Sequence, residues 1–158
     1  MRELLQLLKQ NARLSNAELA VMTGKTEADV AAEIAELERT GVIRGYSVIV
    51  DEEKADRDAV SAYIELKVTP KPDCGFDELA KIVMSYDEVE SVTLMSGGYD
   101  LGLTVTGYSL RDIAAFVAQR LSTLDGVLST TTHFVLKRYK EKGILILDEQ
   151  CDERGVYL

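Results

Sequence analysis

Two adjacent glycines stand immediately before a tyrosine and an aspartate, at Gly97, Gly98, Tyr99 and Asp100. A glycine has no Cβ, so its backbone N–H group can approach a ligand carboxylate closely. The aspartate carboxylate is suited to pair with an α-ammonium group. The segment therefore offers both of the charged contacts that an amino acid requires. The alternative interpretation is an ordinary hairpin turn in which glycine supplies a positive φ angle.

Four further polar residues are candidates for the same pocket. Ser96 directly precedes the glycines, and Thr131, Thr132 and His133 follow one another in a later β-rich stretch. His133 is the only histidine, which excludes a catalytic or metal site built on two histidines. The two cysteines lack the spacing of metal ligands. The sequence therefore predicts a small-molecule site with no catalytic residue, no metal and no cofactor.

A second set of residues is of the types that contact DNA. Basic side chains position a protein on phosphates, whereas polar side chains read base edges and small apolar ones can contact thymine methyl groups. The candidates all lie in the amino-terminal third of the chain: Arg13, Lys25, Thr26, Ala28, Ala32, Arg39 and Arg44.

Helix signals explain how these DNA-contact candidates are positioned. A leucine-rich stripe predicts a first helix over residues 2–10. Ser15 opens an S-x-x-E capping box, which predicts a second helix that buries Leu19 and Met22 and ends at Gly24.

A third helix is predicted to begin after the cap residue Thr26. It buries Val30, Ile34 and Leu37, and it ends at Gly41. The second and third helices have the helix-turn-helix layout, with the third in the recognition position. That third helix carries five acidic side chains and only one basic one, so the alternative that it does not bind DNA specifically stays open.

The boundaries of the chain's parts follow from composition. Residues 42–50 are β-rich and predict a connecting strand at the end of a head formed by residues 1–50. The charged segment 51–58 predicts a linker. We expect a body over residues 59–142 and a tail over residues 143–158, which adds an edge strand.

The body alternates between strand and helix patterns in the order β-α-β-β-α-β, which predicts an antiparallel sheet with two helices on one face. The opposite face is then open to a second copy of the chain. The strands are expected at residues 60–70, 89–95, 101–105 and 127–136, and the helices around Phe76, Leu79, Ala80 and Val83 and around Leu110, Ile113, Ala114, Val117 and Leu121.

Charge is distributed unevenly between these parts. The formal net charge is −9, with six basic and seven acidic side chains in residues 1–50 and 12 basic and 20 acidic in residues 51–158. Duplex affinity depends largely on Lys and Arg. The near-neutral head therefore predicts weak DNA binding, and the acidity belongs mainly to the body.

Four motifs in the right order make the chain resemble the Lrp/AsnC family, the feast/famine regulators of amino-acid metabolism, over nearly its whole length. They are Asn11-Ala12-Arg13-Leu14-Ser15, Leu37-Glu38-Arg39-Thr40-Gly41-Val42-Ile43-Arg44-Gly45-Tyr46, Ser96-Gly97-Gly98-Tyr99-Asp100-Leu101 and Thr131-Thr132-His133-Phe134-Val135-Leu136.

The resemblance implies an α+β fold with an N-terminal winged helix-turn-helix and a ferredoxin-like βαββαβ domain of the RAM type. It implies a cytoplasmic, non-membrane transcriptional regulator that is not an enzyme. An amino acid or related metabolite would bind between homodimers, which associate further into assemblies such as octamers. The alternative is an effector-binding oligomer whose acidic recognition helix no longer binds DNA specifically.

Overall fold

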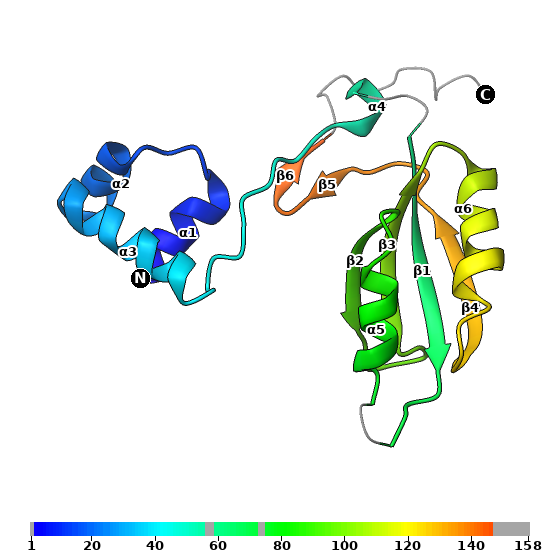
Figure 1. The fold of residues 1–158 in the computed structure, drawn as a ribbon. Coiled ribbons are helices and arrows are strands. Elements are labelled where there is room, and N and C mark those ends of the chain that lie inside the picture. Colours follow the sequence, from blue (N-terminus) through cyan, green and yellow to red (C-terminus); the bar gives the residue numbers. More distant parts are fainter. Residues whose placement is uncertain (1, 56–58, 73–74, 147–158) are drawn as a thin grey trace, which may run out of the picture. The chain divides into compact units, whose positions relative to one another are not determined.

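The computed structural model describes residues 2–55, 59–72 and 75–146. They divide into two units (Figure 1). The first holds the described residues up to Ile49 together with Lys140–Leu145, and the second holds those from Val50 to Tyr139 together with Ile146. No helix of the described residues is long and apolar enough to cross a membrane.

The first unit contains three helices, and they begin and end where the sequence predicts. They are α1 (Arg2–Gln10), α2 (Asn16–Thr23) and α3 (Glu27–Arg39). One apolar cluster joins them, because each helix turns a stripe of aliphatic side chains inward. Its buried members are Leu4, Leu8, Leu19, Ala20, Val30 and Leu37.

The capping box at the start of α2 is complete. The Ser15 Oγ accepts a hydrogen bond from the Glu18 backbone N–H at 3.2 Å, and the Glu18 carboxylate accepts one from the Ser15 N–H at 2.8 Å. Gly24 ends α2 with a φ of 66°, the left-handed conformation that glycine adopts without steric cost. The prediction that Met22 is buried is wrong: Met22 is 54% exposed, and Ala20 fills the core position.

The second unit is built on a four-stranded antiparallel sheet in the order β2-β3-β1-β4, which is the predicted ferredoxin-like arrangement. Two helical segments follow β1 and β3 in the chain, and the second ends in a π-helical turn (Figure 1). The elements are β1 (Val60–Val68), α5 (Asp77–Met84), β2 (Val89–Leu94), β3 (Leu101–Gly107), α6 (Leu110–Phe116) with η1 (Val117–Leu121), and β4 (Val127–Phe134).

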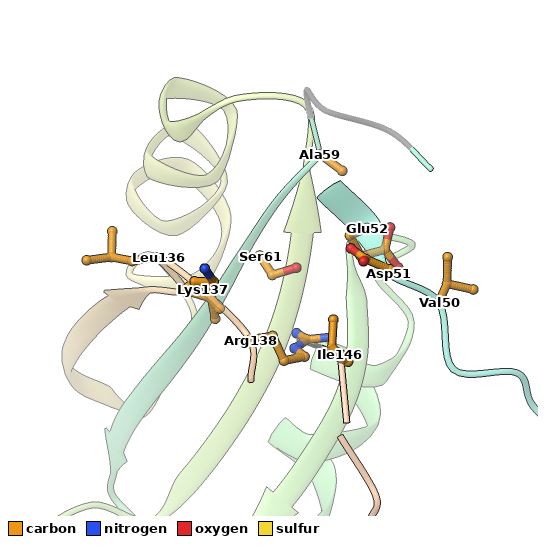
Figure 2. Close-up of a pocket in the computed structure, with 10 residues that line it drawn as sticks. Val50, Asp51, Glu52, Ala59, Ser61, Leu136, Lys137, Arg138 and Ile146 are labelled. Atoms are coloured by element: carbon orange, nitrogen blue, oxygen red, sulfur yellow. The ribbon is translucent and has the colours of Figure 1, made fainter. Parts of the chain in front are cut away.

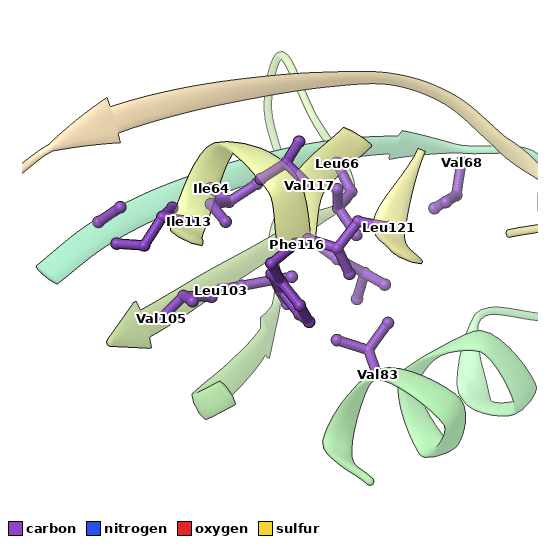
Figure 3. Packing of buried hydrophobic residues seen from close by; sticks show 12 residues of the cluster. Ile64, Leu66, Val68, Val83, Leu103, Val105, Ile113, Phe116, Val117 and Leu121 are labelled. Carbon is purple, nitrogen blue, oxygen red and sulfur yellow. The ribbon is translucent and has the colours of Figure 1, made fainter. Parts of the chain in front are cut away.

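The core of this unit lies between the helices and one face of the sheet (Figure 3). Alternate residues of β1 and β3 point into it, including Ile64, Leu66 and Leu103, each of which has no exposed surface. Phe116 contributes to this core from α6. Of the predicted helix stripe, Ile113, Val117 and Leu121 are buried as expected. The prediction is wrong at Leu110 and Ala114, which are exposed, and Phe116 joins the core in their place.

Three predictions outside the sheet are corrected by the structure. Residues 42–50 form no strand, since no other described segment supplies the hydrogen-bonding partner that a strand needs. Within the predicted linker, Glu52–Ala55 form a short helix, α4, while residues 56–58 lie outside the described residues. The predicted edge strand is instead β6 (Ile144–Leu145), which pairs with β5 (Lys140–Glu141) in a separate hairpin.

Removing the α2 cap should weaken the first unit measurably. We expect Ser15→Ala to lower the free energy of unfolding by about 1 kcal/mol, because the Glu18 N–H loses its acceptor. The measurement is urea unfolding followed by far-UV circular dichroism. Ser47→Ala is the matched control, since the exposed Ser47 caps no helix, and its effect should stay within about 0.5 kcal/mol.

The capping contribution should also depend on pH. The hydrogen bonds from Ser15 lower the pKa of Glu18 from its ordinary value of 4.5. A lowered carboxyl pKa in the folded state adds stability above that ordinary value, and this stability is lost as the pH falls through the lowered pKa. Ser15→Ala removes the hydrogen bond from the Ser15 Oγ to the Glu18 carboxylate but keeps the one from the backbone N–H. The difference between wild type and Ser15→Ala should therefore narrow below pH 4.5 by the contribution of the Oγ contact, and a difference that stays constant would contradict that contact.

Candidate functional site

Asp100 joins the turn between β2 and β3 to the end of β1. Its Oδ2 atom accepts a hydrogen bond from the Val68 backbone N–H at 2.8 Å, and its own N–H donates to the Leu66 carbonyl at 2.9 Å. The Asp100 carbonyl accepts from the Met95 N–H at 2.8 Å and so closes the turn. Asp100 thus has a structural role, while its Oδ1 atom forms no hydrogen bond with the described residues.

Gly97 and Gly98 are exposed, and neither is crowded. A Cβ atom built on either residue would meet no heavy atom within 4 Å, its own chain neighbours apart. Neither glycine has a positive φ angle, so the expectation that glycine supplies one in an ordinary hairpin turn is wrong in that respect. The space beside both glycines is open to another molecule.

Tyr99 follows the two glycines, and its side chain lies on the face of the sheet opposite the helices. Its hydroxyl lies 2.8 Å from the hydroxyl of Tyr63 on β1, with the two rings edge to face. This hydrogen bond, together with burial, raises the pKa of Tyr63 to about 12. The contact depends on Gly102, because a Cβ there would stand 2.0 Å from the Tyr63 hydroxyl oxygen.

Two candidates on β4 lie on the same sheet face. Strand pairing sets His133 opposite Tyr63 and Thr131 opposite Glu65, and the His133 Nε2 atom lies 3.2 Å from a Glu65 carboxylate oxygen. Thr132 pairs with Ile64 and therefore points to the helix-covered side.

The predicted small-molecule residues therefore form two groups. Ser96, Gly97, Gly98 and Asp100 lie at the turn, while Tyr99 extends toward the sheet-face group of Thr131 and His133. Sequence reasoning missed Tyr63 and Glu65, the two β1 residues that contact this second group. Both residues could have been found from the alternation along β1, in which every second residue is polar and lies on the open face of the sheet.

A separate cavity of about 120 Å³ lies at the other end of β1. Figure 2 shows the carboxylates of Asp51 and Glu52 on one side, with Arg138 beside Ile146 on another. None of the predicted site residues lines this cavity.

The predicted DNA-contact residues all lie in the first unit but differ in their surroundings. Thr26 caps α3: its Oγ1 accepts from the Asp29 N–H at 3.1 Å and donates to the Asp29 carboxylate at 2.7 Å. Lys25 forms an ion pair with Glu33. The Arg39 guanidinium makes a two-pronged contact with the carboxylate of Glu36, at 2.8 and 2.6 Å.

The remaining DNA-contact candidates are accessible. Ala28 and Ala32 are exposed on α3. Arg13 and Arg44 are exposed beyond the helix ends and form no ion pair with the described residues. These two arginines are therefore the cations of the predicted set that are available to a phosphate without first leaving a carboxylate.

Known family models match both the amino-terminal and the carboxy-terminal part of the chain. Residues 61–145 match the family model described as the Lrp/AsnC ligand binding domain, and residues 1–44 match a winged helix-turn-helix DNA-binding model.

Individual relatives agree with this assignment. The chain is 45% identical over 155 residues to the uncharacterized HTH-type transcriptional regulator YugG of Bacillus subtilis, covering 98% of this chain and 93% of that protein. It is 26% identical over 145 residues to the leucine-responsive regulatory protein of Haemophilus influenzae, covering 92% of this chain and 87% of that protein.

Solved structures share the fold. The transcriptional regulator NMB0573 of Neisseria meningitidis, in complex with L-Met, has a TM-score of 0.72 at 26% identity and covers 88% of this chain and 89% of its own. The AsnC structure from E. coli has a TM-score of 0.70 at 24% identity, covering 90% of this chain and 94% of its own.

The close approach of Gly102 to Tyr63 generates a test of the sheet-face geometry. We expect Gly102→Ala to displace the Tyr63 ring, break its hydrogen bond to Tyr99 and lower the free energy of unfolding by about 1–3 kcal/mol. The pKa of Tyr63 should fall from about 12 toward its ordinary value of 10.0, which NMR titration of the ¹³C-labelled tyrosines would measure.

Gly97→Ala is the matched control for this substitution. The added methyl group meets no atom and requires no positive φ, so stability should be unchanged or slightly higher and the pKa of Tyr63 should stay raised. Equal effects of the two substitutions would show that the close approach at Gly102 is not what holds Tyr63.

Proposed function

This chain belongs to the Lrp/AsnC family of DNA-binding transcriptional regulators, and on that premise we propose that an amino acid or related metabolite binds at its β2–β3 turn, between copies of the chain. The bound ligand changes how the heads engage DNA. We assign the protein no catalytic role. The observation that carries the proposal is an anchored aspartate beside two unobstructed glycines.

Asp100 is suited to hold the ammonium group of such a ligand. The hydrogen bond from the Val68 N–H fixes the orientation of its carboxylate, and the Oδ1 atom is left to accept from a ligand. An acceptor that is held in place before the ligand arrives loses little side-chain entropy on binding. The backbone of Gly97 and Gly98 can approach the ligand carboxylate because no side chain intervenes.

The turn needs a second wall to enclose a ligand, and we propose that another copy of the chain supplies it. Ser96, Gly97 and Gly98 are exposed. Leu94 and Met95, which directly precede the turn, are exposed large apolar residues that a partner would bury. A ligand held between copies favours one assembly over another only if the two assemblies bind it with different affinities.

The names of similar proteins support the ligand class. NMB0573 is described in complex with L-Met, and the Haemophilus influenzae relative is named leucine-responsive. Methionine and leucine are both α-amino acids, which carry the ammonium and carboxylate groups that the turn is suited to bind. Homodimers that associate further, up to octamers, would place several such turns at contacts between copies.

A ligand screen tests the effector site. Thermal unfolding of the full chain in the presence of each of the common amino acids should identify at least one that raises the melting temperature. At about 100 times its dissociation constant, such a ligand adds roughly 2.7 kcal/mol of stability. If none of them shifts the transition, the amino-acid proposal is wrong.

Asp100→Asn then tests the site. The amide oxygen can still accept from the Val68 N–H, so the fold is preserved while the charge for the ammonium group is lost. We expect the ligand-induced shift to disappear. Asp87→Asn is the control, because Asp87 is exposed and forms no ion pair with the described residues. A full response in Asp100→Asn would exclude Asp100 as the ammonium partner.

A mobility-shift assay tests the DNA contacts. The full chain should bind a duplex from its own upstream region at low salt. Arg44→Gln should weaken binding to all sequences and make the slope of log K against log salt shallower by about 0.9, the value of one phosphate contact. Arg111→Gln removes an exposed charge from the second unit and should leave binding unchanged.

One observation favours a second candidate function, an effector-binding oligomer whose head does not bind DNA specifically. The outward face of α3 presents Ala28 and Ala32, and its one arginine, Arg39, is held by Glu36. Retention of the ligand response without any mobility shift, on folded oligomer, would identify this second function.

A further inference from the structure

Acidic side chains on α3 engage the basic residues of the helix-turn-helix. Glu36 holds Arg39 through two hydrogen bonds, at 2.8 and 2.6 Å, within the same helix. Glu33 holds Lys25, which lies in the turn between α2 and α3. Two of the four basic residues predicted to contact DNA are therefore already paired with carboxylates.

The position of Arg39 on the helix makes this pairing relevant to DNA. At about 100° per residue, Arg39 lies on the side of α3 opposite the buried Val30 and Leu37. Glu36 lies beside it on the same exposed surface. The recognition helix thus presents a carboxylate next to its only arginine.

The two ion pairs differ in how firmly they are held. The Arg39 and Glu36 side chains are 72% and 51% exposed, so water competes for both, and the pair exchanges readily. Glu33 is only 17% exposed. The hydrogen bond between Lys25 and Glu33 raises the pKa of Lys25 and lowers that of Glu33, because it stabilises the charged form of each.

We propose that Glu36, with Glu33 in support, acts as an intramolecular phosphate mimic that limits the DNA affinity of each head. For DNA to gain the full charge of Arg39 or Lys25, a phosphate must displace the carboxylate that now neutralises it. The displaced carboxylate then lies near the DNA backbone. This inference rests on the proposed function, because it presupposes that the head binds DNA.

A limited affinity per head has a consequence for regulation. When one head binds weakly, occupancy of DNA depends on several heads engaging together, since linkage raises the effective concentration of the second head. A ligand that changes the assembly of the bodies would then change DNA occupancy strongly. The glutamates thereby couple DNA binding to the number of heads that an assembly presents.

A double-mutant cycle on the full-length chain tests the proposal, with the affinity for one duplex measured at several salt concentrations. Glu36→Gln should raise affinity several-fold at low salt and steepen the salt slope by about 0.9, because Arg39 gains a phosphate contact. The variant should therefore lose about 3.5-fold more affinity than wild type between 50 and 200 mM salt. In the Arg39→Gln background, the same substitution should give a much smaller gain.

Glu27→Gln is the matched control, because it removes one negative charge from the same helix at a residue that forms no ion pair with the described residues. It should leave the salt slope unchanged. Unchanged far-UV circular dichroism in all variants would verify the fold.

The outcomes separate the two proposals. Equal gains from Glu36→Gln with and without Arg39, or from Glu27→Gln, would overturn the phosphate-mimic role and reduce it to a general charge effect. An unchanged affinity in Glu36→Gln, with wild type bound, would overturn it while leaving the regulator intact. If neither wild type nor any variant binds DNA at low salt, the phosphate-mimic role and the DNA-binding part of the proposed function both fail.

Discussion

The alternation of side chains along β1 is the constraint on which the second unit depends. β1 lies between β3 and β4, so its register sets the pairing on both sides of the sheet centre. Ala62, Ile64 and Leu66 face the helices and are completely buried, whereas Tyr63 and Glu65 face the open side. A shift of one residue would bury the polar set and expose the apolar one, which is why a single register is specified.

The candidate ligand site follows from that register. Asp100 reaches the backbone at Leu66 and Val68 because β3 pairs with β1 up to Leu101 and Leu66. Tyr63 passes over Gly102 for the same reason. The turn and the open sheet face are therefore connected through β1, and a ligand or a second copy of the chain that contacts one of them acts close to the other.

The first unit combines a well-formed helix-turn-helix with a charge pattern that opposes strong DNA binding. The caps at Ser15 and Thr26 and the buried leucines make the scaffold, and none of them needs a basic surface. Affinity is set separately, by the balance between the exposed arginines and the glutamates of α3. If copies of the chain assemble as proposed, heads that each bind DNA weakly would make occupancy depend on cooperation between heads.

Local sequence determined α1, α2 and α3, the caps of α2 and α3, and the order of strands and helices in the sheet unit, because hydrophobic periodicity and capping residues act over a few neighbouring positions. It also indicated the turn at residues 96–100, whose ligand chemistry stays a prediction. Only the tertiary structure decided that Asp100 is bound to the Val68 N–H, that Tyr63 contacts Tyr99, and that residues 42–50 have no strand partner among the described residues. These facts depend on which segments meet in space. The pairing of Arg39 with Glu36 lies between these cases: its spacing of three residues is visible in the sequence, but the rotamers that join the two side chains are not.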